Sequence, residues 1–105
     1  MEIIEAPLFT QLITELLPDD EYRELQNALL AYPDAGKVLE EGSGLRKLRW
    51  GTKQGGKRGG LRIIYLWRPN QNKLYLVTVY KKNRLDDLTK DQIKTLAKWA
   101  KEHLK

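Results

Sequence analysis

The chain has 105 residues, 41% hydrophobic and 31% charged, a length and composition that suit one globular domain with a modest apolar core. The absence of cysteine excludes disulfides and thiolate metal sites, and no apolar run approaches the ~20 residues of a membrane span. The first residues also lack the basic and apolar regions of a signal peptide. We therefore expect a cytoplasmic protein with no membrane contact and one domain over residues 1–105.

The N-terminal third predicts a short strand followed by two helices. Residues 3–4 favour a strand, and residues 8–17 carry apolar side chains at i, i+4 spacing, which is typical of an amphipathic helix. A proline ends that helix, and Asp19 and Asp20 supply an N-cap for a second one. The apolar stripe of the second helix runs up to Pro33. Because the link between them is so short, the two helices are expected to form an antiparallel hairpin.

The remainder predicts three strands and a last helix. Residues 45–50, 61–68 and 74–81 are alternating or rich in β-branched and aromatic residues, and the short polar link between the last two favours an antiparallel hairpin. Thr89 and Gln92 match a capping box at the start of an apolar helical stripe. The predicted order is β-α-α-β-β-β-α, an α+β fold whose antiparallel sheet carries helices.

Charge is distributed very unevenly along the chain, whose formal net charge is +5. Residues 1–41 hold ten acids and two bases, whereas residues 42–85 hold twelve bases and no acid, and residues 86–105 are nearly balanced. Ordinary protein surfaces intersperse both signs, so a merely solvated cationic surface is the less favoured interpretation. The pattern predicts a one-sided positive field and a polyanion as partner, most naturally a nucleic acid.

Alternation in the predicted strands separates basic from apolar side chains. Leu48 and Trp50 fall on one face, which leaves Lys47 and Arg49 side by side on the other. Arg62 shares a face with apolar neighbours, so we expect it at a strand end, where the sheet meets water. Five strand aromatics could stack bases, but their spacing is more typical of core and cross-strand packing: Trp50, Tyr65, Trp67, Tyr75 and Tyr80.

The stretch GTKQGGKRGG between two of these strands holds five glycines and three bases, and it lacks the lysine–Ser/Thr pair of a Walker A loop. Such a loop could close over a backbone phosphate. Two-metal nucleases need clustered carboxylates, and a two-histidine mechanism is impossible with one histidine. If the domain is catalytic, we therefore expect cationic side chains to do the chemistry. The RNA contacts expected from the loop and from the exit of the last strand are Lys53, Lys57, Arg58, Lys81 and Arg84.

Two segments, GLRKLRWGTKQGGKRGGLRIIYLW and LYLVTVYKKNRLDDLT, resemble the HigB branch of the RelE/ParE toxin superfamily over about residues 42–90. The shared features are GLRK-[IL]-R, a Gly/Lys-rich loop, KRGG-x-RIIY, a β-hairpin, and Y-x-KN-x-x-DLT before a helix. The resemblance implies a RelE-like fold and a type II toxin that enters the ribosomal A site on the 30S subunit and cleaves mRNA there. It also implies a metal-independent reaction, in which the RNA 2′-OH attacks the neighbouring phosphate. A cognate antitoxin, commonly with a helix-turn-helix domain, would neutralise the toxin.

The same resemblance assigns roles to individual residues. Arg62 matches the arginine that contacts the scissile phosphate, and Lys82 matches the basic residue that assists the transition state or the leaving group. Lys47 and Arg49 match an alternating basic pair in which a lysine serves as base. Arg46 is a further expected RNA contact, and it is the runner-up for this basic pair if the strand register slips by one. Leu88 stands about where archetypal RelE proteins carry a tyrosine.

Two other functions remain open from the sequence. One is a non-catalytic nucleic-acid or ribosome-binding module, in which loss of each basic residue would weaken binding gradually. The other is a ParE-like toxin, which poisons gyrase and cuts no RNA, because a shared fold does not determine the activity.

Overall fold

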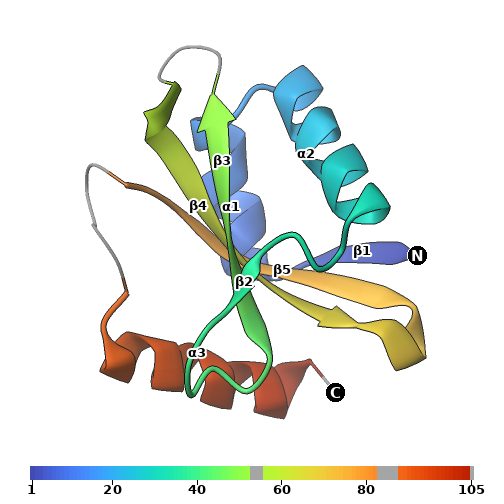
Figure 1. The fold of residues 1–105 in the computed structure, drawn as a ribbon, viewed down its shortest axis with the longest axis vertical. Helices are drawn as coiled ribbons and strands as arrows, with labels where there is room; N and C mark the ends of the chain where they lie inside the picture. The colour runs from blue at the N-terminus through green and yellow to red at the C-terminus, as the bar shows by residue number, and fades with distance from the viewer. Residues whose placement is uncertain (53–55, 83–87, 105) are drawn as a thin grey trace.

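The computed structural model describes residues 1–52, 56–82 and 88–104, and it leaves the side chains of residues 52 and 56–59 outside the described part. Within these ranges no helix is long and apolar enough to cross a membrane. The elements, shown in Figure 1, are β1 (Glu2–Glu5), α1 (Pro7–Leu16), α2 (Asp19–Ala31), β2 (Lys37–Val38), β3 (Leu45–Thr52), β4 (Gly56–Arg68), the 3-10 turn η1 (Pro69–Gln71), β5 (Lys73–Lys81) and α3 (Lys90–His103). Helices and sheet together confirm the α+β class.

The strands form one five-stranded sheet in the order β1-β5-β4-β3-β2. Two details differ from the sequence-based prediction. A two-residue strand, β2, precedes the three predicted strands and pairs with β3 at the sheet edge. In addition, β1 runs parallel to β5, so the sheet is mixed rather than antiparallel. Alternation has the same period in both orientations, which is why the sequence pattern does not reveal the direction of pairing.

Both predicted N-terminal helices are present, but the cap of the second is different. Pro18, with an extended backbone, occupies the N-cap of α2, and no side chain caps the helix. Asp19 and Asp20 instead lie in the first turn, so the N-cap predicted for them is wrong. Their carboxylates still favour this end of the helix, because the macrodipole leaves partial positive charge there.

Each face of the sheet buries a separate apolar cluster. One cluster joins α1 and α2 to the sheet through Phe9, Ile13, Leu25, Leu29, Ile63 and Tyr65. The other joins α3 to the opposite face through Leu45, Ile64, Leu66, Ala97, Ala100 and Leu104. Figure 1 shows α3 across the end of the sheet that lies opposite the β3–β4 tip. Within the described part of the chain, α3 therefore covers one end of the second face, and no helix covers that face toward the tip.

Tyr65 fixes the connection that leads from α2 into β2. Its hydroxyl donates to the Pro33 carbonyl at 2.7 Å and accepts from the Gly36 N–H at 2.8 Å. A Cβ on Gly36 would lie 2.7 Å from the Tyr65 ring, so glycine permits this close approach. Arg46 adds hydrogen bonds from its guanidinium to the carbonyls of Asp34 and Gly36, at 3.2 and 2.8 Å. Edge strand β2 is thereby anchored beside β3.

The start of α3 carries the predicted capping box. Thr89 Oγ1 accepts from the Gln92 N–H at 3.1 Å, and Gln92 Oε1 accepts from the Thr89 N–H at 2.9 Å. These reciprocal bonds satisfy two donors that a helix N-terminus leaves open. They also fix where α3 begins after the chain leaves β5.

Candidate functional site

A row of three side chains crosses the middle of the sheet on the face that α3 partly covers. Arg49 of β3 pairs with Arg62 of β4, and Arg62 in turn pairs with Tyr80 of β5. Directly opposed residues on antiparallel strands have their Cβ atoms only about 4.5–5.5 Å apart. The side chains of two arginines therefore leave neighbouring strands side by side, and the side chain of a tyrosine leaves the next strand beside them.

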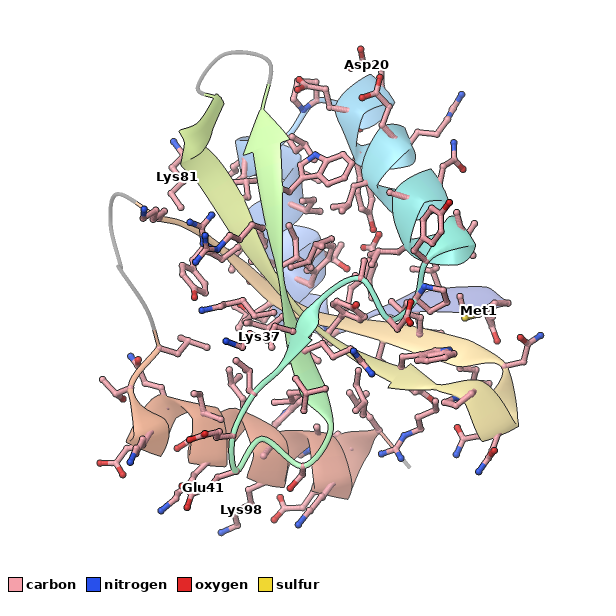
Figure 2. The ribbon with its side chains drawn as sticks, in the orientation of Figure 1. Met1, Asp20, Lys37, Glu41, Lys81 and Lys98 are labelled. Atoms are coloured by element: carbon pink, nitrogen blue, oxygen red, sulfur yellow. The ribbon has the colours of Figure 1, made fainter. Side chains whose placement is uncertain are left out.

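A second row lies one step nearer to α3. Lys47 of β3 is opposite Ile64 of β4, which is opposite Thr78 of β5. Edge strand β2 extends this row, because Lys37 pairs with Lys47 and so faces the same side. Figure 2 labels Lys37 where β2 crosses the view, and nitrogen-tipped side chains gather beside it between α3 and the β3–β4 tip. The sequence analysis did not include Lys37 among the site residues.

Arg62 is buried, with 3% of its surface exposed. The expectation that it lies at a strand end in water is wrong, because β4 begins at Gly56 and Arg62 stands near the middle of the strand. Its Nη1 donates to the Leu61 carbonyl at 3.2 Å. A like charge directly opposite, on the exposed side chain of Arg49, is unfavourable. An anion held between the two guanidinium groups would reverse the sign of that interaction.

Lys82 continues the same face beyond the end of β5. Its backbone N–H donates to the Gly60 carbonyl at 3.2 Å, so pairing with β4 persists to this residue. Alternation then places Lys82 on the face of Tyr80, while Lys81 is exposed on the opposite one. Its direct partner Gly60 has no side chain, and Arg62 is a diagonal neighbour of Lys82 on β4. The structure thus brings Lys47, Arg49, Arg62 and Lys82 to one face of the sheet.

Arg46 lies on the other face. Besides its bonds to the connection before β2, its guanidinium is 6.0 Å from the centre of the Trp67 ring, a cation–π distance. These contacts fix the sheet edge and keep Arg46 apart from the cationic face.

The remaining predicted RNA contacts are placed only in part. Lys53 and Arg84 lie outside the described residues, and so do the side chains of Lys57 and Arg58, whose backbone belongs to β4. The strands reach further into the Gly/Lys-rich segment than the sequence predicted. β3 continues to Thr52 and β4 begins at Gly56, so the loop between them is shorter than expected.

The strand aromatics are mainly structural, as their spacing indicates. Tyr65 and Tyr75 are buried, and Trp50 and Trp67 pack against the cluster under α1 and α2. Tyr80 packs against the α3 cluster and is half-buried. Of the five, Tyr80 alone lies in the row of Arg49 and Arg62, where it can contact a ligand bound there.

The cationic face has the chemistry of an oxyanion site. Arginine offers planar forks of donors that match phosphate oxygens, and lysine offers a mobile point charge. Lys37, Lys47, Arg49, Arg62 and Lys82 approach from four consecutive strand segments, so their charges converge on one region of the sheet.

Comparison with known families agrees with this fold. The model of the RelE toxin family, the toxin of the RelE/RelB toxin–antitoxin system, matches residues 19–105. The chain belongs to the RelE toxin family. The match runs from α2 to the C-terminus and includes every strand that carries the cationic face. This RelE protein is therefore the toxin of a toxin–antitoxin system, and a cognate antitoxin is its partner.

Proposed function

We propose that this RelE protein is an endoribonuclease of the HigB branch, which cleaves mRNA in the ribosomal A site and so inhibits translation. The observation that carries the proposal is the buried Arg62 beside Arg49, with Lys47 and Lys82 on the same sheet face. A cationic face of this kind suits the binding of one phosphodiester. The branch assignment rests on the sequence motifs, which span the strands of this face.

In the proposed reaction the 2′ oxygen of the RNA forms a bond to the adjacent phosphorus, and the bond from phosphorus to the 5′ oxygen breaks. The products are a 2′,3′-cyclic phosphate and a free 5′-hydroxyl end. Lys47 takes the proton of the 2′-OH, and Lys82 gives a proton to the departing 5′ oxygen. Arg62 and Arg49 hold the non-bridging oxygens. No metal takes part.

The arrangement suits this chemistry because the nucleophile belongs to the substrate. The protein has to orient the ribose and the phosphate in line and to stabilise the charge that grows on the phosphorane. Guanidinium groups fixed before the reaction supply that stabilisation without reorganising. Burial of Arg62 fixes its position, and exposure of Arg49 leaves room for RNA to reach it.

The test is to map mRNA 5′ ends after brief induction of the protein, with ribosomes active and with ribosomes blocked. We expect new 5′ ends within codons only when ribosomes are active, and we expect Arg62→Ala and Lys82→Ala to abolish them. Lys98→Ala is the matched control, because Lys98 lies on the outer side of α3 (Figure 2). Undiminished cleavage by the double variant would overturn the assigned chemistry. Growth arrest without new 5′ ends would favour a ParE-like gyrase poison or a non-catalytic binding module.

A further inference from the structure

The basic side chains of the cationic face lie on a diagonal across the sheet. Lys82 follows the end of β5, and Arg62 and Arg49 form the next row on β4 and β3. Lys47 lies one row further along β3, so it is on the other side of the arginine row from Lys82. An anion held by the two arginines would therefore have one lysine on each side of it.

Edge strand β2 extends this diagonal by one more lysine. In the row of Lys47, β4 and β5 contribute the buried Ile64 and Thr78, so the charge of that row lies toward β2. There Lys37 is exposed and pairs directly with Lys47. Its backbone is offset from that of Arg49 by about 6.6–6.8 Å along the strands and by about 4.7–4.9 Å across them. One sugar–phosphate unit of an extended RNA strand, together with the reach of a lysine side chain, covers this offset.

Strand β2 is held in place from both ends, although it has only two residues. The hydroxyl of Tyr65 fixes the connection before it, as described above. After it, the Leu39 N–H donates to the Leu45 carbonyl at 2.9 Å, and the Leu39 side chain packs against the cluster under α3. The turn that follows holds Glu41 at φ 58°, a left-handed conformation that persists only where surrounding contacts maintain it. The backbone of Lys37 is therefore fixed before any ligand binds.

The proposed roles of Lys47 and Lys82 set the direction in which RNA crosses the diagonal. Lys47 takes the proton of the attacking 2′-OH, and this hydroxyl belongs to the nucleotide on the 5′ side of the scissile phosphate. Lys82 protonates the departing 5′ oxygen, which belongs to the nucleotide on the 3′ side. An in-line displacement places these two oxygens on opposite sides of the phosphorus, as the two lysines are on opposite sides of the arginine row. The RNA should therefore run from 5′ to 3′ in the direction from β2 to the exit of β5.

We propose that Lys37 binds the phosphate on the 5′ side of the attacking nucleotide, here called the upstream phosphate, so that the protein holds two successive phosphates of the mRNA. The direction of the RNA rests on the proposed function, whereas the place of Lys37 rests on the pairing of β2 with β3 alone. With a phosphate held at each of its ends, the ribose that carries the 2′-OH is fixed for attack. Lys37 is thus a positioning residue and takes no part in proton transfer.

Ribosomes programmed with mRNA that has a 2′-deoxy sugar at the cleavage position test this contact in the absence of cleavage. A neutral methylphosphonate replaces either the upstream phosphate or the downstream phosphate, which is the one after the scissile phosphate. On mRNA with neither replacement, Lys37→Ala should weaken binding of the protein by roughly three- to tenfold. With the upstream methylphosphonate the same substitution should change affinity by less than about twofold, because the partner charge is already absent. With the downstream methylphosphonate the full loss should remain.

Two further variants serve as controls. Lys37→Arg keeps the charge, so its affinity should stay within about twofold of the wild type and should still depend on the upstream phosphate. Lys98→Ala, on the outer side of α3 (Figure 2), should bind all three mRNAs as the wild type does. If the effect of Lys37→Ala disappears with the downstream methylphosphonate instead, the RNA runs in the opposite direction and the proposal is wrong. An equal effect on all three mRNAs would assign Lys37 to another phosphate, such as one of ribosomal RNA, and would overturn the proposal, as would no effect on any.

Cleavage of mRNA with an ordinary ribose, measured on the same ribosomes, distinguishes this proposal from the proposed function. If Lys37 couples to the upstream phosphate but no mRNA is cut, the phosphate contact stands and the assigned chemistry is wrong. If mRNA is cut but Lys37 does not couple to the upstream phosphate, the chemistry stands and the contact is wrong. A wild-type protein that fails to bind programmed ribosomes would overturn both.

Discussion

Arg49 and Arg62 lie directly opposite one another on β3 and β4, one exposed and the other 3% exposed, so two like charges share one cross-strand position. Opposed like charges destabilise a sheet, and burial of one of them adds a desolvation cost. A fold retains such a pair at the expense of stability. We interpret the pair as a preformed anion site, in which bound phosphate replaces the repulsion with two sets of charge-assisted hydrogen bonds.

Replacement of Arg62 by methionine should separate stability from activity. Methionine fills most of the buried volume without charge, so we expect the free energy of unfolding to be unchanged or raised by about 1 kcal/mol or more. Cleavage should fall by about 10²–10³-fold, as for the loss of one preorganised transition-state donor. Urea unfolding and cleavage of mRNA on programmed ribosomes measure the two quantities. A large loss of stability with normal cleavage would contradict the anion-site interpretation.

Lys37 should contribute to RNA binding from the edge of the sheet. Because Lys37 faces Lys47, its removal in Lys37→Ala should weaken binding of a short RNA that carries a 2′-deoxy sugar at the cleavage position. For single-stranded RNA, each lost phosphate contact makes the negative slope of log K against the logarithm of the salt concentration shallower by about 0.7. Salt titrations of the wild type and the variant measure this slope. Lys101→Ala, an exposed change on α3, should leave the slope as it is. An equal slope for Lys37→Ala would remove Lys37 from the site.

The sequence predicted which residues of β3 share a face because strand alternation is a local property. The pattern of residues 45–50 placed Lys47 and Arg49 opposite Leu48 and Trp50, and the structure confirms this division between the two faces. The RelE/ParE superfamily, the α+β class and the Thr89 capping box were also predicted correctly. Each of these features depends on residues close together in the chain.

What the sequence did not reveal depends on contacts between distant segments. Strand β2 has two residues and no periodic pattern, and it exists because Tyr65 and Arg46 anchor the connection before it. Lys37 joins the cationic face only through that strand. Likewise, Arg62 is buried because β4 extends five residues before Leu61, into a segment whose glycines favoured a loop assignment. Glycine propensity is a weak guide where a neighbouring strand supplies the pairing.

Tyr65 should stabilise the edge of the site through its hydroxyl. Tyr65→Phe leaves the buried Gly36 N–H without its partner, and an unsatisfied buried donor costs about 1–3 kcal/mol. We expect the free energy of unfolding to fall by that amount and RNA binding by Lys37 to weaken as β2 loosens. Urea unfolding and the salt titration described for Lys37 measure both effects. Tyr32→Phe, an exposed change just after α2, is the control for loss of a hydroxyl. A Tyr65→Phe protein as stable as this control would contradict the anchoring role.

Because of Tyr22, we expect the free energy of unfolding to depend on pH in the alkaline range. Its hydroxyl donates to Glu5 Oε2 at 2.5 Å, and Thr10 donates to the other oxygen of the same carboxylate at 2.6 Å, so β1, α1 and α2 meet at one network. Burial raises the pKa of Tyr22 well above its ordinary value, and the hydrogen bond to Glu5 and the charge of Glu5 raise it further. The folded protein therefore holds the Tyr22 proton at a pH where the unfolded chain releases it.

The sign of the effect follows from proton binding. Below about pH 10, the ordinary tyrosine value, both states keep the proton and the network contributes fully to stability. As pH rises above that value, the unfolded state binds fewer protons than the folded state, so the free energy of unfolding falls. Tyr22→Phe removes this dependence. Urea unfolding between roughly pH 8 and pH 11 should show the wild-type advantage over Tyr22→Phe shrinking with pH. A constant difference across that range would show that Tyr22 ionises equally in both states.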